Sequence, residues 1–264
     1  MADLHPGERS DGEPKDLGER SDGEPKDLGE RSDGEPKAVL FDFSGTLFRL
    51  EEDESWFAGY TDADGAPIEG ESQAELMRRM TAPMGLPVPM DPDMEADWHQ
   101  RDLDPVKHRR VYHHVLASSG IADPDQRTRL YGRIANPDCW TVYPDTADAL
   151  RLLHGKGIRI GVLSNIAYDI RPAFVREGID GLVDAYLLSF EVGAMKPSED
   201  IFAAGVAALG APAEQTLMVG DSEEADGGCR ALGMPFVLVD PVPTAQRPDG
   251  LLTALRHAGI TAGL

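Results

Sequence analysis

The sequence lacks the features that would place it in a membrane or in an oxidising compartment. None of its apolar runs approaches the roughly 18 consecutive residues that a membrane-spanning helix requires. The amino-terminal stretch is polar and acidic, so we expect no signal peptide. The two cysteines, Cys139 and Cys229, are too few for a disulfide framework, and neither stands in a metal-binding pair. These absences predict a cytoplasmic protein.

Positive charge is scarce as well. The formal net charge is −22 and the isoelectric point is near 4.5. Nucleic acids and anionic membranes bind basic faces, so we predict neither as a partner. A small anionic substrate is still compatible with this charge if a bound metal ion supplies local positive charge. Beyond residue 37 the only lysines are Lys107, Lys156 and Lys196, so a lysine at a functional position is conspicuous.

Residues 1–37 are predicted to form a disordered arm. An 11-residue unit, Gly-Glu-Arg-Ser-Asp-Gly-Glu-Pro-Lys-Asp-Leu, starts at Gly7 and again, almost unchanged, at Gly18 and Gly29. It has too few apolar side chains to offset the entropy of ordering. We interpret it as a tandem duplication tolerated at a chain terminus, with an interaction arm as the alternative.

The rest of the chain predicts an α/β fold. Five short apolar segments are typical of buried strands: 38–42, 158–163, 184–189, 216–220 and 236–240. Helical patterns alternate with the last four of them, near 145–155, 168–177, 198–209 and 223–232. This alternation predicts a parallel sheet with crossover helices on both faces.

An insertion separates the first two predicted strands. The gap is about 95 residues long, far more than a crossover needs. It contains helical patterns near 71–81, 105–118 and 124–135. We therefore predict a helical cap over residues 50–140, with the core formed by 38–49 and 141–264. An insertion that begins just after the first strand lies over the carboxyl ends of the strands, where a lid belongs.

Polar residues follow four of the predicted strands or precede the next helix. They are Asp42 with the turn Ser44-Gly45-Thr46, then Ser164-Asn165, Lys196, and Gly220-Asp221 with Asp226. The carboxyl ends of parallel strands meet at one edge of the sheet, so these groups are expected to converge. Carboxylate oxygens suit Mg²⁺, and an aspartate is able to attack phosphorus as a covalent nucleophile.

Together these residues resemble the motifs of the haloacid dehalogenase-like hydrolase superfamily, in the subfamily with a helical (C1-type) cap. The resemblance extends from residue 38 to about residue 240. It implies a Rossmann-like core with an inserted α-helical cap. It also implies a Mg²⁺-dependent phosphohydrolase or phosphoryl-transfer enzyme that acts on a small phosphorylated metabolite.

The resemblance further implies a role for each residue. Asp42 would be the nucleophile that forms an aspartyl-phosphate, Lys196 would neutralise charge, and Thr46 would support the turn. The phosphoryl group would be bound by Ser164, Asn165 and the turn at Gly45. Mg²⁺ would be held by Asp42, the Ser44 carbonyl and Asp221, with Asp226 orienting metal-bound waters or Lys196.

Ser44 departs from the family pattern. Most phosphatases of the superfamily carry a second aspartate at this position, as the acid that protonates the leaving group. A serine is a poor general acid, and losing such a group typically costs about 10²–10⁴-fold in rate. We therefore expect a phosphohydrolase that is slow in one step, or one whose substrate has a good leaving group.

Two alternatives stay open. The chain would be a non-catalytic or regulatory protein that binds a phosphorylated metabolite, or a dehalogenase or phosphonatase-like hydrolase. Dehalogenases lack the Gly-Asp pair present here at Gly220-Asp221, and phosphonatases need a cap lysine, for which Lys107 is the one candidate in 50–140. No sequence pattern names the substrate or the oligomeric state.

Within the cap, several residues are interpreted as structural. The adjacent His113 and His114 do not share a helix face, so we expect them on a solvated surface rather than at a metal. The apolar stripe Leu76, Met77, Met80 and Met84 is expected in the cap interior. The charged side chains of Arg78, Arg79, Arg109 and Arg110 are expected to be solvated or salt-bridged.

Overall fold

The computed structural model describes residues 34–51, 55–81 and 85–261. Most of the predicted arm, and Met84 of the predicted cap stripe, lie outside these residues. The last residues of the arm already join the core: the Lys37 amide donates to the Gln215 carbonyl at 2.9 Å, and the Lys37 carbonyl accepts from Arg159 at 3.0 Å. Lys37 is therefore hydrogen-bonded to the core through its own backbone.

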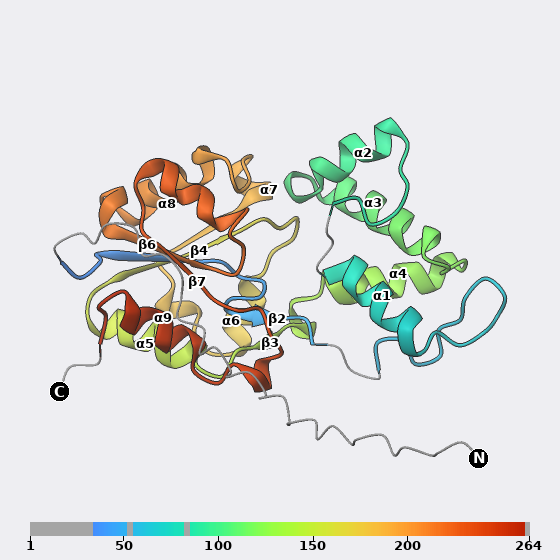
Figure 1. Ribbon diagram of the computed structural model, residues 1–264, viewed down its shortest axis with the longest axis horizontal. Helices are drawn as coiled ribbons and strands as arrows, with labels where there is room; N and C mark the ends of the chain where they lie inside the picture. The colour runs from blue at the N-terminus through green and yellow to red at the C-terminus, as the bar shows by residue number, and fades with distance from the viewer. Residues whose placement is uncertain (1–33, 52–54, 82–84, 262–264) are drawn as a thin grey trace, which may run out of the picture.

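The core contains a five-stranded sheet in the order β5-β4-β1-β6-β7 (Figure 1). Its strands are β1 (Ala38–Phe41), β4 (Arg159–Ser164), β5 (Ala185–Leu188), β6 (Thr216–Gly220) and β7 (Phe236–Leu238). All neighbouring strands are parallel. Each predicted strand is present, with ends that differ by at most two residues, and the predicted parallel α/β fold is confirmed.

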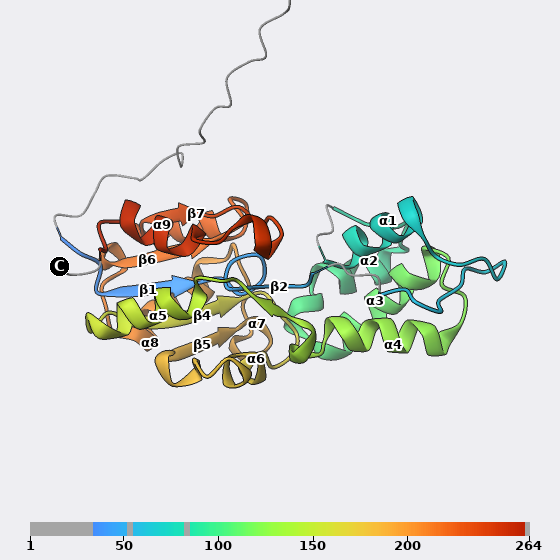
Figure 2. The same ribbon diagram turned by 90° about the horizontal axis from the view of Figure 1, so that it is seen from below.

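Helices cover both faces of this sheet, as Figures 1 and 2 show. They are α5 (Thr146–Gly155), α6 (Arg171–Arg176), α7 (Ser189–Val192), α8 (Glu199–Leu209) and α9 (Gly250–His257). The central strand β1 is buried on both sides: Leu40 packs in the cluster with Phe202 of α8, and Val39 packs in the cluster with Leu150 of α5 and Leu255 of α9. A strand buried on both faces has no polar alternation, which is why its sequence is a continuous apolar run.

Some helical segments of the core differ from the prediction, among them the short α7, which was not predicted. The helix expected near 223–232 is a 3₁₀ run, η5, over Asp226–Leu232. It contains the consecutive glycines Gly227 and Gly228, each of which disfavours an α-helix by about 1 kcal/mol relative to alanine. Helix α9 was not predicted, because it is short and follows an irregular, proline-rich stretch.

The cap contains α1 (Gly70–Thr81), α2 (Pro92–His99), α3 (Pro105–Ser118) and α4 (Pro124–Ile134), with the 3₁₀ turn η1 (Arg101–Leu103). Each of α2, α3 and α4 begins with an Asp-Pro pair. The side chains of Asp91, Asp104 and Asp123 accept hydrogen bonds from the first backbone amides, and proline fits the first helical position. Helix α2 was missed because its polar and apolar residues follow no clear helical period.

The cap lies at the end of the sheet toward which the strands run (Figures 1 and 2). The chain leaves the core along β2 (Phe48–Arg49) and returns along β3 (Thr141–Val142), and these two short strands pair antiparallel. The β2–β3 pair lies close to the predicted limits of the insertion. On this basis we propose residues 50–140 as the cap. None of the helices in the described part of the chain has the length and apolarity to cross a membrane.

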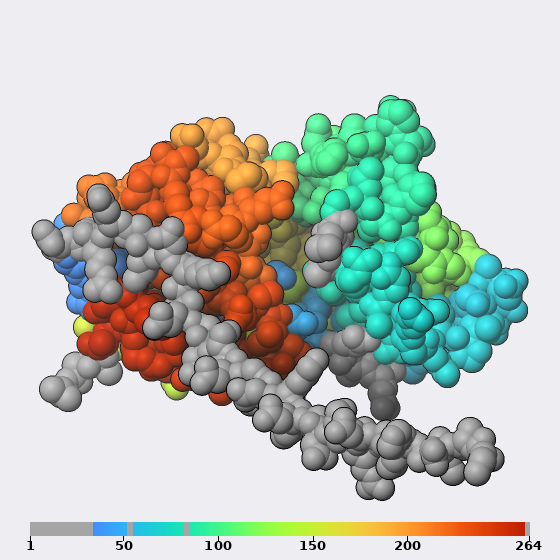
Figure 3. Space-filling view, in the orientation of Figure 1, coloured from blue at the N-terminus to red at the C-terminus, as the bar shows by residue number. Residues whose placement is uncertain are grey.

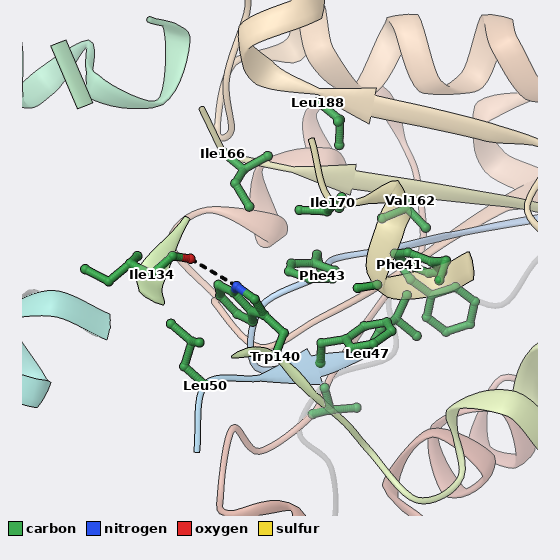
Figure 4. Close-up of a cluster of buried hydrophobic side chains, with 14 of the residues drawn as sticks. Phe41, Phe43, Leu47, Leu50, Ile134, Trp140, Val162, Ile166, Ile170 and Leu188 are labelled. Atoms are coloured by element: carbon green, nitrogen blue, oxygen red, sulfur yellow. Dashed lines mark hydrogen bonds between the residues drawn. The ribbon is translucent and has the colours of Figure 1, made fainter. Parts of the chain in front are cut away.

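An apolar cluster joins the cap to the core beneath the turn that follows β1 (Figure 4). Phe43 lies in this turn, and its ring centroid is 5.0 Å from that of Phe48 and 4.8 Å from that of Trp140. The Trp140 indole donates to the carbonyl of Ile134, the last residue of α4, at 3.1 Å. The turn that bears the predicted nucleophile is therefore supported by packed aromatic rings.

Candidate active site

A cavity of about 300 Å³ lies where the cap meets the carboxyl ends of the strands. In Figure 3 the same junction is visible as a furrow between the orange core and the cyan and green cap. Most of the predicted site residues line the cavity, namely Asp42, Ser44, Ser164, Asn165, Lys196, Asp221 and Asp226. The predicted convergence of the four motifs is present in the structure.

Lys196 is at the centre of the charged groups. Its Nζ donates to Asp42 Oδ1 at 2.6 Å and to Asp226 Oδ1 at 2.6 Å, and the Leu163 carbonyl lies 3.3 Å away. Burial disfavours the charge on this lysine, but the carboxylates of Asp226 and Asp42 outweigh burial and raise the pKa of Lys196. The lysine is therefore held as a cation between two carboxylates.

Three further hydrogen bonds fix the position of Lys196, two at its own backbone and one at its partner Asp226. The side-chain amide of Asn165 donates to the Lys196 carbonyl at 2.9 Å and accepts from the Lys196 amide at 2.7 Å. The second carboxylate oxygen of Asp226 accepts from the Ser222 amide at 2.9 Å. The side chain of Asn165 thus positions the lysine, a contact that sequence reasoning did not anticipate, because it predicted only its backbone near the phosphoryl group.

Three carboxylates are grouped closely enough to share a cation. Asp42, Asp221 and Asp226 each offer one oxygen, and these oxygens lie within 4.8 Å of one another. Burial, together with repulsion from the neighbouring carboxylates, raises the pKa of both Asp42 and Asp221. Since one ammonium faces three carboxylates, of which Asp42 and Asp226 are buried and Asp221 is half-buried, a hard divalent cation with oxygen ligands fits this donor set.

The close approach of the carboxylates depends on two glycines. Gly45 has a φ of +77°, and a Cβ added to it would lie 2.2 Å from Asp221 Oδ2. A Cβ added to Gly220 would lie 2.2 Å from Asp226 Oδ2. Any larger residue at either position would displace a carboxylate of the cluster, so both glycines shape the candidate cation site.

Arg247 holds the turn after β1 from behind and was missed by the sequence analysis. Its guanidinium donates to the carbonyls of Gly45 at 2.7 Å and Asp240 at 2.8 Å, and also to that of Thr46. It is buried and stacks on Tyr143, with 3.3 Å between the guanidinium carbon and the ring centroid. The sequence around it, Ala-Gln-Arg-Pro, carries no signal of this role.

Two predicted residues lie behind the cavity rather than on its surface. The Gly45 amide donates to the Phe48 carbonyl at 2.7 Å, so it is already used within the turn. The Thr46 hydroxyl is buried and has no hydrogen-bond partner among the described residues. The turn is supported through the carbonyls of both residues, which Arg247 binds, and not through the threonine side chain.

The cap supplies a wall of the cavity that the sequence analysis did not identify. It includes Arg101, Asp102, His108 and Tyr112. Burial, reinforced by the charge of Arg101, lowers the pKa of His108 to about 3, so this imidazole is neutral. Its Nδ1 lies 3.0 Å from the Tyr131 hydroxyl. These residues come from η1 and α3, whose packing no local pattern specifies.

The other cap residues singled out in the sequence have structural surroundings. Leu76, Met77 and Met80 are buried, as predicted, and Met80 also reaches the cavity. Arg78 and Arg79 both pair with Glu75, and Arg110 pairs with Asp97. The prediction for the histidine pair was wrong in one respect, because His113 and His114 are half-buried between cap elements instead of solvated.

Comparison with known proteins agrees with this geometry. A family model described as haloacid dehalogenase-like hydrolase matches residues 36–228. A ribulose-1,5-bisphosphate 5-phosphatase of Halopiger xanaduensis is 35% identical over 128 residues, which are 45% of this chain and 52% of that protein. A phosphoserine phosphatase of Thermus thermophilus is 29% identical over 161 residues, which are 59% of this chain and 65% of that protein. The chain thus spans about half to two thirds of the length of these curated relatives.

A solved structure shares the fold. The L-2-haloacid dehalogenase of Xanthobacter autotrophicus aligns with a TM-score of 0.56 at 21% identity, over 83% of each chain. The family model covers most of this chain, and the matched segment contains the four motif groups that meet at the carboxyl edge of the sheet. The chain belongs to the haloacid dehalogenase-like hydrolase family.

Proposed function

We propose that this protein is a Mg²⁺-dependent phosphatase that acts on a small phosphorylated metabolite through an aspartyl-phosphate on Asp42. The observation that carries the proposal is the buried pair of Asp42 and Lys196, with 2.6 Å between Oδ1 and Nζ, beside the carboxylates of Asp221 and Asp226. The names of its relatives, a ribulose-1,5-bisphosphate 5-phosphatase and a phosphoserine phosphatase among them, favour phosphate esters as substrates.

Each of the following residues of the cavity has its own role in the first chemical step. A free oxygen of Asp42 attacks phosphorus, and Lys196 offsets the negative charge that collects on the carboxylate and the phosphoryl oxygens. Ser164 at the end of β4 presents a hydroxyl to those oxygens. Asp226 and Asn165 keep the lysine in place, so its charge need not reorganise during the reaction.

The proposed metal belongs to the same group of oxygens. Asp42 and Asp221 would hold Mg²⁺, together with the Ser44 carbonyl. When bound, the ion supplies positive charge that neutralises the carboxylates and the phosphate. Asp226 is already bonded to Lys196 and to the Ser222 amide, which favours its role in orienting the lysine over direct coordination.

The phosphonatase alternative has no support from the cap lysine. Lys107 lies 3.6 Å from Asp97 and also donates to Gln100, and it does not line the cavity. The dehalogenase alternative rests on a likeness of fold, whereas the grouped carboxylates favour a metal-assisted reaction on phosphate.

The proposal is tested by measuring phosphate release from a panel of phosphate esters, with Mg²⁺ and with chelator. We expect Mg²⁺-dependent release by the full chain and none by Asp42→Asn. The exposed Asp148→Asn on α5 is the matched control and should behave like the wild type. Release of halide from haloacids without metal, or unchanged phosphate release by Asp42→Asn, would refute the proposal.

A further inference from the structure

Ser44 leaves the proposed reaction without its usual proton donor. When Asp42 displaces an alkoxide from phosphorus, the leaving oxygen has to receive a proton, and a serine hydroxyl does not supply one readily near neutral pH. The proton therefore has to come from another group that lines the cavity. Lys196 is hydrogen-bonded to Asp42 and Asp226, and Asp221 is grouped with these carboxylates at the candidate cation site.

Most of the other titratable groups that line the cavity, from the cap and from the core, are unsuited to this task. His108 is neutral, because burial lowers its pKa to about 3. Burial raises the pKa of Tyr112 to about 12, and that of Tyr168 also lies well above its usual value. Arg101 is a permanent cation whose guanidinium donates to the Trp98 carbonyl at 2.9 Å and lies over its ring. Asp102 is the remaining titratable group of the cavity lining, and it is the carboxyl that the described part of the cap contributes there.

The position of Asp102 is fixed against the core. It lies in η1, between α2 and α3, and its backbone carbonyl accepts from the Ser189 hydroxyl of α7 at 2.5 Å. The same hydroxyl accepts from the Ile166 amide just beyond β4 at 2.9 Å. This chain of contacts ties Asp102 to the strand end that carries Ser164, and Asp102 lines the same cavity as Asp42 and Ser44.

The surroundings of Asp102 favour a carboxyl that keeps its proton. The residue is 7% exposed. Its nearest charged neighbour is Arg101, with 3.5 Å between Nη2 and Oδ2, and the neutral His108 ring lies 4.0 Å away. Burial raises the pKa of Asp102, and the charges of Arg101 and Lys196 offset only part of this effect. The groups facing it are Arg101 from η1, His108 and Tyr112 from α3, and Lys196 and Tyr168 from the core.

We propose that Asp102 is the general acid and base of this enzyme, supplied by the cap in place of the aspartate that Ser44 replaces. The assignment rests on the proposed phosphatase function. As Asp42 forms its bond to phosphorus, the bond from phosphorus to the leaving oxygen breaks, and that oxygen takes the proton of the Asp102 carboxyl. The products of this step are an alcohol, an aspartyl-phosphate and an ionised Asp102.

The second step restores both groups. A water attacks phosphorus from the side that the alcohol has left, and Asp102 takes one proton from it. The bond between phosphorus and Asp42 breaks, which releases inorganic phosphate and leaves Asp42 as a carboxylate. The same carboxyl serves both steps because the leaving alcohol and the entering water occupy the same side of phosphorus.

The test compares two esters in Asp102→Asn. An alkyl phosphate has a poor leaving group that needs a proton, whereas p-nitrophenyl phosphate has a good one that does not. We expect kcat/KM for the alkyl ester to fall by about 10²–10⁴-fold, the usual contribution of a general acid. For the aryl ester kcat/KM should change little, because it reports only steps up to formation of the aspartyl-phosphate. Retained aryl turnover also shows that the variant is folded.

Two further variants sharpen the result. Ser44→Asp, added to Asp102→Asn, should restore part of the alkyl activity because it returns a carboxyl to the position used by most relatives. Asp125→Asn, an exposed aspartate in the first turn of α4, is the control and should affect neither ester. An equal loss for both esters, or no loss for either, would overturn the assignment of Asp102 as the general acid and base. The proposed phosphatase function would not be affected by that result. If the wild type hydrolyses neither ester, the proposed function fails, and the assignment with it.

Discussion

Replacing Arg247 by alanine tests whether the turn that bears the nucleophile is held from behind. The guanidinium donates to three carbonyls, those of Gly45, Thr46 and Asp240, and stacks on Tyr143. A hydrogen bond to a charged group contributes about 1.5–3 kcal/mol, and a desolvated cation over an aromatic ring about 2 kcal/mol. The cost of burying the charge offsets part of these gains.

From these contributions we expect Arg247→Ala to lower the free energy of unfolding by about 3–5 kcal/mol, because buried carbonyls lose their donor. The matched control is Arg256→Ala on α9, where an exposed arginine lies 3.5 Å from Asp249. A surface pair of this kind contributes about 0–1 kcal/mol.

The assay is urea denaturation of the three proteins, followed by phosphate release from each under folding conditions. We expect kcat to fall in Arg247→Ala even where the protein is fully folded, because Gly45 and Asp221 are in close contact and a displaced turn displaces the metal site. If Arg247→Ala lowers the free energy of unfolding by less than about 1 kcal/mol, as the control does, the three hydrogen bonds of Arg247 do not stabilise the turn.

Three further outcomes follow from the site. Gly45→Ala should weaken Mg²⁺ binding in calorimetry and slow phosphate release, because its Cβ would displace Asp221; an unchanged affinity would contradict this. Lys196→Met should abolish turnover and destabilise the fold by about 3–5 kcal/mol in urea denaturation, since it leaves buried carboxylates unpaired. Lys156→Met, at an exposed lysine that pairs with Glu35, should keep full activity. The ratio of alkyl to aryl kcat/KM should fall as pH rises through the raised pKa of Asp102, because only the alkyl ester needs the protonated acid; a ratio independent of pH would argue against it.

The core of the fold and the chemical groups at its edge were predictable from the sequence because their signals are local. A buried parallel strand is a continuous apolar run, and the residue at its carboxyl end is next to it in the chain. Asp42, Ser164 and Asp221 could therefore be placed without knowledge of tertiary packing. Lys196 was conspicuous because the folded part of the chain has so few lysines.

The missed residues reach the site through packing that no local pattern encodes. Arg247 follows the last strand in an irregular stretch and returns to a turn some 200 residues earlier. Asp102 lies in a 3₁₀ turn between two cap helices, and only the docking of that turn on Ser189 brings it to the cavity. The misassigned helix at η5 has a similar cause, since Asp226 is held by Lys196 and Ser222 in a segment whose two glycines disfavour a regular helix.

The central claim is that Asp42 carries the phosphoryl group during turnover, and rapid acid quenching followed by peptide mapping tests it most directly. The enzyme is mixed with p-nitrophenyl phosphate and Mg²⁺, quenched during the first turnover, and digested. We predict that the peptide containing Asp42 gains the mass of one phosphoryl group, and that Asp42→Asn shows no such gain. A first turnover that releases p-nitrophenol while this peptide stays unmodified, or while another residue carries the phosphoryl group, would contradict the account.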